Sequence, residues 1–155
     1  MSRALPRLAL ARAVLLPLLP LLLWGCALPQ IVIHDDPLSA REHMKLGMAY
    51  EAKGEAARAE GEYRLAARHE PLARLYLGNL LYGQGRPDDA EGEYRTALKA
   101  LPDNPEALNN LAWLLHERGK NTDEAEALAV RAVELAPARP AFLDTLRAIR
   151  AARGR

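Results

Sequence analysis

A pattern of small, aromatic and turn-forming residues recurs three times between residues 37 and 137, and it constrains the fold more than any other feature of the chain. Each copy opens with Leu and a small residue, has Tyr or Leu three positions later, and ends at Pro. The leading pairs are Leu46–Gly47, Leu77–Gly78 and Leu111–Ala112. A unit of roughly 34 residues cannot bury its own apolar face, so the repeat indicates a stack of similar units.

The recurring positions suit pairs of packed helices. A small residue lets two helices approach closely, and a later Gly ends the first helix because its backbone adopts positive φ without strain. Pro stops the second helix. The small residues of the second helices are Ala59, Ala90 and Ala125, the turn glycines are Gly54, Gly85 and Gly119, the aromatic fillers are Tyr50, Tyr63 and Tyr94, and the closing prolines are Pro71, Pro102 and Pro137.

This periodicity predicts seven helices, over 38–53, 56–69, 72–84, 87–100, 105–118, 122–136 and 140–152. Their N-termini carry capping signals: Ser39 with Glu42 forms a capping-box pattern, and Asn104 precedes a proline at the first helical position. Asn121 with Glu124 predicts a third cap of this kind. The composition agrees, because the chain is rich in Ala, Leu and Arg and poor in residues that favour sheets.

The repeat resembles the tetratricopeptide repeat, a helix–turn–helix unit that stacks into solenoids. The resemblance implies an all-α fold, a right-handed α-solenoid of about three helix pairs over 37–70, 71–101 and 102–137. Residues 138–155 then supply a C-terminal capping helix that closes the open end of the stack. Its arginines make its outer side cationic, which we interpret as a solvated face.

The first 25 residues are typical of a secretory signal, with three arginines before an apolar stretch that is too short to span a bilayer. The sequence that follows this stretch resembles the lipobox of bacterial lipoproteins, with Leu23, Gly25 and Cys26 matching and Trp24 bulkier than usual. The resemblance implies lipid attachment at Cys26 and a lipidated tether over 26–36. An ordinary signal peptide with an incidental Cys, or an uncleaved anchor, remains the alternative.

A lipidated protein of this kind is expected to face the periplasm in a bacterial cell envelope. Ala27 after Cys26 favours transfer to the outer membrane in Gram-negative lipoproteins, by the same resemblance. Lys plus Arg total 21 and Asp plus Glu total 20. This near balance gives no electrostatic footprint for nucleic acid, so we expect none as a partner.

The first helices of tetratricopeptide units line a concave groove, and the resemblance therefore implies a peptide-binding face. Its lining in this chain is Met44, Met48, Leu75, Asn79, Tyr82, Asn109, Asn110, Trp113 and His116, with Glu51 beside them. Asn79 and Asn110 fall in adjacent repeats, where two amides could hold a peptide backbone. Trp113 fits a structural role as well as a binding role, and the two methionines fit partial burial.

The asparagine pair also resembles part of the carboxylate clamp of chaperone-binding repeats. The clamp's cations are missing, since Leu75, Ala141 and Thr145 stand where Lys or Arg is required. We therefore expect a general peptide groove rather than capture of a terminal carboxylate.

Nothing in the sequence favours catalysis. The four histidines lack metal-ligand spacing, Ser39 already serves as a cap, and no Gly-rich phosphate loop is present. We expect no enzyme activity, metal, cofactor or small-molecule substrate. The sequence favours an envelope adaptor that binds a partner segment, similar to the pilotin-like lipoproteins of type IV pilus assembly or of secretion complexes. A regulator of peptidoglycan enzymes is the alternative.

Overall fold

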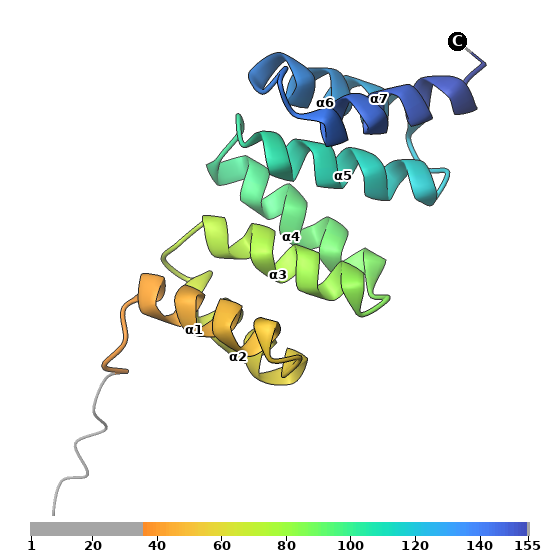
Figure 1. Ribbon diagram of the computed structural model, residues 1–155. Coiled ribbons are helices and arrows are strands. Elements are labelled where there is room, and N and C mark those ends of the chain that lie inside the picture. The colour runs from red at the N-terminus through yellow and green to blue at the C-terminus, as the bar shows by residue number, and fades with distance from the viewer. Residues whose placement is uncertain (1–35, 155) are drawn as a thin grey trace, which may run out of the picture. The chain divides into compact units, whose positions relative to one another are not determined.

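The computed structural model describes residues 36–154, and within that range the chain forms seven helices and no strand. The helices are α1 (Ala40–Ala52), α2 (Ala56–Ala66), α3 (Leu72–Gly83), α4 (Pro87–Ala100), α5 (Pro105–Glu117), α6 (Thr122–Leu135) and α7 (Pro140–Ala152). They form three pairs, α1 with α2, α3 with α4 and α5 with α6, stacked in chain order, and α7 packs on the third pair (Figure 1). The predicted all-α solenoid with a final capping helix is confirmed.

Helices α4 and α7 have the predicted bounds, α3, α5 and α6 end one residue earlier than predicted, and α1 and α2 are shorter by three residues each. Helix α1 begins at Ala40 rather than at 38, because Ser39 is extended and caps the helix from outside it. Helix α2 ends at Ala66 rather than at 69, because the carbonyl oxygen of Ala66 accepts from the backbone N–H of His69 and of Glu70 in a tight turn. Helix α2 therefore has 11 residues, whereas the corresponding helix α4 has 14.

Two of the three predicted caps are confirmed. The Ser39 N–H donates to the Glu42 carboxylate at 2.7 Å while Ser39 Oγ accepts from the Glu42 N–H, which completes the capping box. Asn104 Oδ1 accepts from the Ala107 N–H at 2.8 Å. The cap predicted at Asn121 is wrong: this residue has φ 43°, and its side chain donates to Glu124 instead of accepting from the helix N-terminus.

In each of the first two helix pairs, a glycine of the first helix packs against a tyrosine ring of the second helix. A Cβ on Gly47 would lie 2.6 Å from the ring of Tyr63, and a Cβ on Gly78 would lie 2.6 Å from the ring of Tyr94. Both rings are buried. The corresponding residues of the third pair are Ala112 and Ala129, also fully buried, so a larger residue on the first helix accompanies a smaller one on the second.

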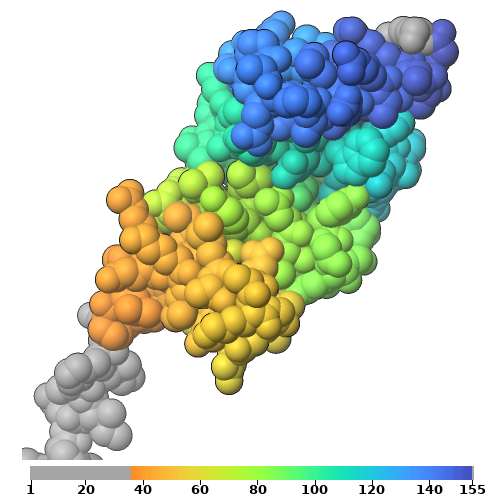
Figure 2. Space-filling view, viewed as in Figure 1, coloured from red at the N-terminus to blue at the C-terminus, as the bar shows by residue number. Residues whose placement is uncertain are grey.

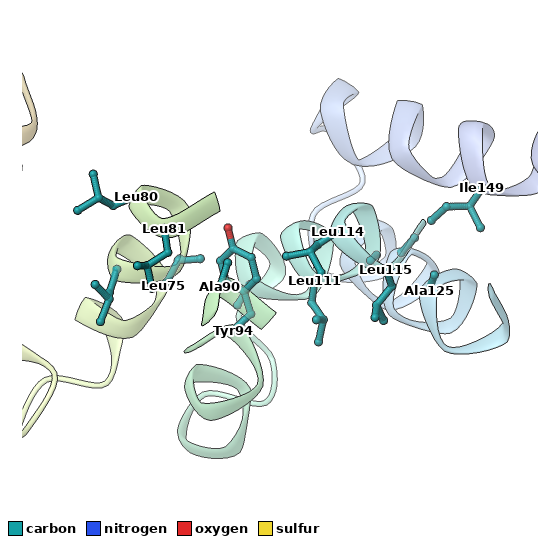
Figure 3. Close-up of a cluster of buried hydrophobic side chains, with 14 of the residues drawn as sticks. Leu75, Leu80, Leu81, Ala90, Tyr94, Leu111, Leu114, Leu115, Ala125 and Ile149 are labelled. Carbon is teal, nitrogen blue, oxygen red and sulfur yellow. The ribbon is translucent and has the colours of Figure 1, made fainter. Parts of the chain in front are cut away.

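The hydrophobic core runs continuously from one pair to the next. Figure 3 shows Tyr94 between the leucines of α3 and those of α5, with Ile149 of α7 beyond Leu115. Figure 2 shows successive segments of the described chain in contact with their neighbours along the stack. Each pair is thus stabilised by the next one, and α7 covers the last.

Helix α7 differs from the earlier first helices at one position. Leu146 corresponds to the leading leucines, so Arg147 stands where the other repeats have Gly47, Gly78 and Ala112. The Arg147 side chain is exposed and lies 3.2 Å from Asp144. A bulky cation therefore occupies the position at which a following helix would have to approach closely.

Ion pairs link the second helices and turns of adjacent repeats. The Arg95 guanidinium lies 2.5 Å from Glu124 on the next repeat and 3.0 Å from Glu91 on its own helix. Similar ion pairs join Arg86 to Glu60 at 2.8 Å and Arg153 to Glu126 at 3.2 Å. These ion pairs therefore cross the boundaries between successive repeats.

The signal segment 1–25, Cys26 and all of the tether except Asp36 lie outside the described residues. Among residues 36–154, none of the helices has the length and the apolar character that crossing a bilayer requires.

We predict that Gly78→Ala lowers the free energy of unfolding by about 2 kcal/mol, since its methyl group would overlap the Tyr94 ring and overpacking typically costs this much. Urea unfolding followed by circular dichroism measures the change. The control is Gly92→Ala on α4, where a Cβ meets nothing within 4 Å; it should leave stability unchanged or raise it by up to about 1 kcal/mol.

The double variant Gly78→Ala/Tyr94→Ala has the same residues as the third helix pair at these two positions. It should lower the free energy of unfolding by less than the sum of the two single changes. Equal losses in both glycine variants would contradict the close-approach argument.

We predict that Arg95→Gln lowers the free energy of unfolding by about 0.5 kcal/mol at pH 7, a small effect because the pair is partly exposed. The Arg95 guanidinium holds the pKa of the Glu124 carboxyl below its ordinary value, so the stabilisation is present above the unfolded pKa and is lost as the pH falls through the folded pKa. Unfolding at pH 3 should show a smaller difference. Arg147→Gln, in an exposed pair within one helix turn, is the control; a pH-independent effect of Arg95→Gln would count against the ion pair.

Candidate functional site

A small pocket opens where α3 and α5 lie side by side. Its volume is about 210 Å³. It is lined by Asn79, Tyr82, Tyr94, Asn109, Asn110 and Trp113. Pockets for small-molecule ligands usually measure several hundred Å³, so this one suits a single side chain or a short stretch of backbone.

Asn79 is the centre of the hydrogen bonds in this pocket. Its Oδ1 accepts from the Tyr94 hydroxyl at 2.9 Å and from Asn110 Nδ2 at 2.8 Å. Burial raises the pKa of the Tyr94 phenol, which keeps it an O–H donor. The Asn79 Nδ2 group takes part in neither bond and remains available as a donor. The amide pair predicted across adjacent repeats therefore exists, and one of its donors is unused.

The aromatic side of the pocket is a second hydrogen-bonded chain. The Trp113 indole N–H donates to the Tyr82 hydroxyl at 3.2 Å, and that hydroxyl donates to the Glu117 carboxylate. Burial and the bond to Glu117 raise the pKa of Tyr82, so this hydroxyl also stays protonated. The polar hydrogens of both rings are thus used within the protein.

Asn109 carries an unsatisfied acceptor. The residue is 8% exposed, and its Nδ2 donates weakly to Asn110 Oδ1 at 3.4 Å. Among the side-chain nitrogen and oxygen atoms of the described residues, only its Oδ1 and Arg118 Nη1 are buried without a hydrogen-bond partner, and the arginine atom lies 3.7 Å from Glu91. A buried acceptor left unpaired costs about 1–3 kcal/mol of stability.

Five of the nine predicted groove residues meet in this pocket, namely Asn79, Tyr82, Asn109, Asn110 and Trp113. The placement of Leu75 in the groove is wrong: it is 6% exposed and packs in the hydrophobic core, because its position on α3 faces the neighbouring helices. Met44 is half-buried against the core, while Met48 is 42% exposed on α1. Neither methionine lines the pocket.

His116 lies beside the pocket rather than in it. Its ring centroid is 5.7 Å from that of Trp113, and its side chain lines a separate hollow with the α5–α6 turn and the end of α7. Two residues were not predicted: Tyr94, which lines the pocket, and Glu117, which accepts from the Tyr82 hydroxyl. A buried tyrosine hydroxyl needs a partner, and Glu117 lies one helical turn after Trp113, so both signals were present in the sequence.

No group of His, Cys, Asp and Glu side chains within residues 36–154 is arranged to hold a metal ion. The pocket offers amides, phenols and an indole, and the raised pKa values of both phenols keep their hydroxyl groups protonated. Its chemistry is therefore recognition through hydrogen bonds and ring faces.

A family model described as Tetratricopeptide repeat matches residues 75–140. This match covers the second and third helix pairs and the pocket between them. Tetratricopeptide repeats are generally a non-catalytic interaction fold. A search of the curated proteins finds no significant match to the sequence.

Solved structures share the fold at low identity. The first tetratricopeptide-repeat domain of Spaghetti (RPAP3), bound to the HSP90 peptide SRMEEVD, is 20% identical with a TM-score of 0.69, over 79% of this chain and 99% of that one. The Yersinia enterocolitica type III secretion chaperone SycD, in complex with a peptide of the translocator YopD, is 20% identical with a TM-score of 0.64, over 73% and 93%.

A tetratricopeptide repeat protein from Parabacteroides merdae is 21% identical with a TM-score of 0.68, and the match covers 77% of this chain and 47% of that longer one. These likenesses establish that residues 36–154 adopt the fold of tetratricopeptide-repeat solenoids.

We predict that Asn109→Leu raises the free energy of unfolding by about 1 kcal/mol, because it removes an unpaired buried acceptor and fills the site with an apolar group of similar size. Chemical unfolding measures it. Asn110→Leu, one residue along, is the matched control: it deletes the 2.8 Å bond to Asn79 and should lower stability by about 1 kcal/mol. Destabilisation by both variants would show that the Asn109 oxygen is satisfied in solution.

Proposed function

We propose that this tetratricopeptide-repeat chain is a non-catalytic scaffold that binds a segment of a partner protein across the face formed by α3 and α5. The observation that carries the proposal is the pocket in which an amide pair from adjacent repeats lies beside Tyr82 and Trp113. The peptide complexes of the Spaghetti domain and of SycD support it, because both proteins share the fold of this chain.

The pocket residues have complementary tasks in this proposal. The unused Asn79 Nδ2 donates to a backbone carbonyl of the partner segment, which gives affinity that does not depend on the partner's sequence. Tyr82 and Trp113 provide large, rigid contact area with few rotatable bonds. The hydrogen bond between them fixes both rings before binding, which lowers the entropy lost on association.

The N-terminal sequence supports a location for this scaffold. We propose that Cys26 is lipidated after removal of 1–25, and that the protein faces the periplasm from a membrane of the bacterial envelope, with the outer membrane favoured. Anchoring would raise the effective concentration of the groove for partners at that surface. Assembly of a type IV pilus or of a secretion complex is the role we favour for such an adaptor.

We predict that Tyr82→Ala combined with Trp113→Ala weakens capture of the partner at least about tenfold while helical content is unchanged, because aromatic anchors dominate peptide interfaces. Crosslinking in the native host, followed by purification and mass spectrometry, measures capture. Lys99→Ala on the exposed part of α4 is the control. If the folded double variant captures the partner as well as the parent does, this pocket is not the binding site. If the partners that depend on the pocket are peptidoglycan enzymes, the protein is an adaptor of those enzymes and not of pilus or secretion assembly.

We predict that Cys26→Ser prevents incorporation of labelled palmitate and releases the protein from the membrane fraction, since a chain without its lipids has no stable anchor. Labelling and fractionation of cells that produce the full-length chain measure both. Trp24→Ala is the companion variant, because a smaller residue fits the lipobox better and should leave labelling equal or higher. A Cys26→Ser protein that stays as membrane-bound as the parent would show that acylation is not the attachment.

A further inference from the structure

The hydrogen-bonding groups of the pocket are mostly engaged within the protein. The Trp113 N–H and the Tyr82 and Tyr94 hydroxyl protons are all donated within the protein. The Asn79 amide keeps its N–H donors, whereas the Asn109 Oδ1 is too deeply buried to meet a ligand. The exposed carboxylate of Glu117, which the Tyr82 hydroxyl already orients, is an accessible acceptor beside the pocket, so a ligand group that brings several N–H donors can bond to it.

The charge near the pocket also favours a positively charged ligand. None of the six lining residues is charged, and the ionised group joined to them by a hydrogen bond is Glu117. The cation of α3, Arg74, is engaged with Glu93 of α4 at 2.9 Å, and neither residue lines this pocket. Within residues 36–154, the pocket thus presents negative charge to a ligand, and no cation lines it.

The aromatic residues narrow the choice of ligand group further. Trp113 and Tyr82 are both partly exposed and line the same small space. The faces of these rings attract cations, most strongly for Trp. A guanidinium group combines a positive charge, five N–H donors and a flat surface that stacks on rings, whereas an ammonium group lacks the flat surface.

We propose that the pocket between α3 and α5 binds the guanidinium group of an arginine in the partner segment. The group stacks on Trp113 and Tyr82 and faces the Glu117 carboxylate. This inference rests on the proposed function, because it names the side chain that the groove selects.

The test is a selection from a random nine-residue peptide library on the full-length chain, with the folded Tyr82→Ala/Trp113→Ala variant as counter-selection. The strongest binders are synthesised with each arginine replaced in turn by citrulline, which keeps the shape and loses the charge, by lysine and by glutamate. The Trp24→Phe chain leaves Trp113 as the only indole, so its fluorescence reports binding at the pocket.

We expect one arginine per binder whose replacement by citrulline weakens binding about tenfold, with a smaller loss for lysine and the largest for glutamate. Glu117→Gln should reduce the arginine-to-citrulline ratio to about threefold or less. These ratios compare ligands on one protein, so a purely structural effect of the variants would not move them.

Three outcomes overturn the inference. Binders that tolerate citrulline or lysine at every arginine exclude a guanidinium site, as do binders in which glutamate is preferred; either result leaves the scaffold function standing. Failure to select any peptide that depends on Tyr82 and Trp113 removes the proposed function and this inference together.

Discussion

The contact between a glycine of one helix and a tyrosine ring of the next is the constraint on which the stack depends. At Gly47 and Gly78 the ring lies where a side chain would otherwise begin, so the two helices of a pair are joined by backbone against aromatic surface. Apolar contact of this kind is strong because the tyrosine is wholly buried while little conformational freedom is lost. Successive pairs then share one continuous core, which makes each repeat dependent on its neighbours.

The same contact supports the pocket. Tyr94 fills the space beside Gly78 and extends its hydroxyl to Asn79, so one residue sets both the approach of α4 to α3 and the orientation of the amide. Asn79 in turn holds Asn110 of the next repeat. The geometry of the amide pair therefore depends on the register between two repeats. A single tyrosine therefore links the packing of the helix pair to the geometry of the pocket.

The fold could be predicted from the sequence because its determinants are local or periodic. The small residues, turn glycines and caps at Ser39 and Asn104 act within one helix or one pair. The prediction at Asn121 failed because that residue adopts a left-handed backbone, which depends on the longer turn around it. Leu75 was misplaced because spacing along one helix does not show how far the next repeat covers it. Likewise, the absence of a hydrogen-bond partner for the Asn109 oxygen depends on tertiary packing, so no sequence pattern could have predicted it.

Arg147 disfavours the packing of a further helix against α7. The residue holds the place where Gly or Ala admits a second helix elsewhere, and its charged side chain would have to be desolvated before any helix could settle there. Tandem duplication that lengthened this protein would consequently succeed only upstream of α7. New units would enter the interior of the array, and the terminal helix would move outward with its charge still facing water.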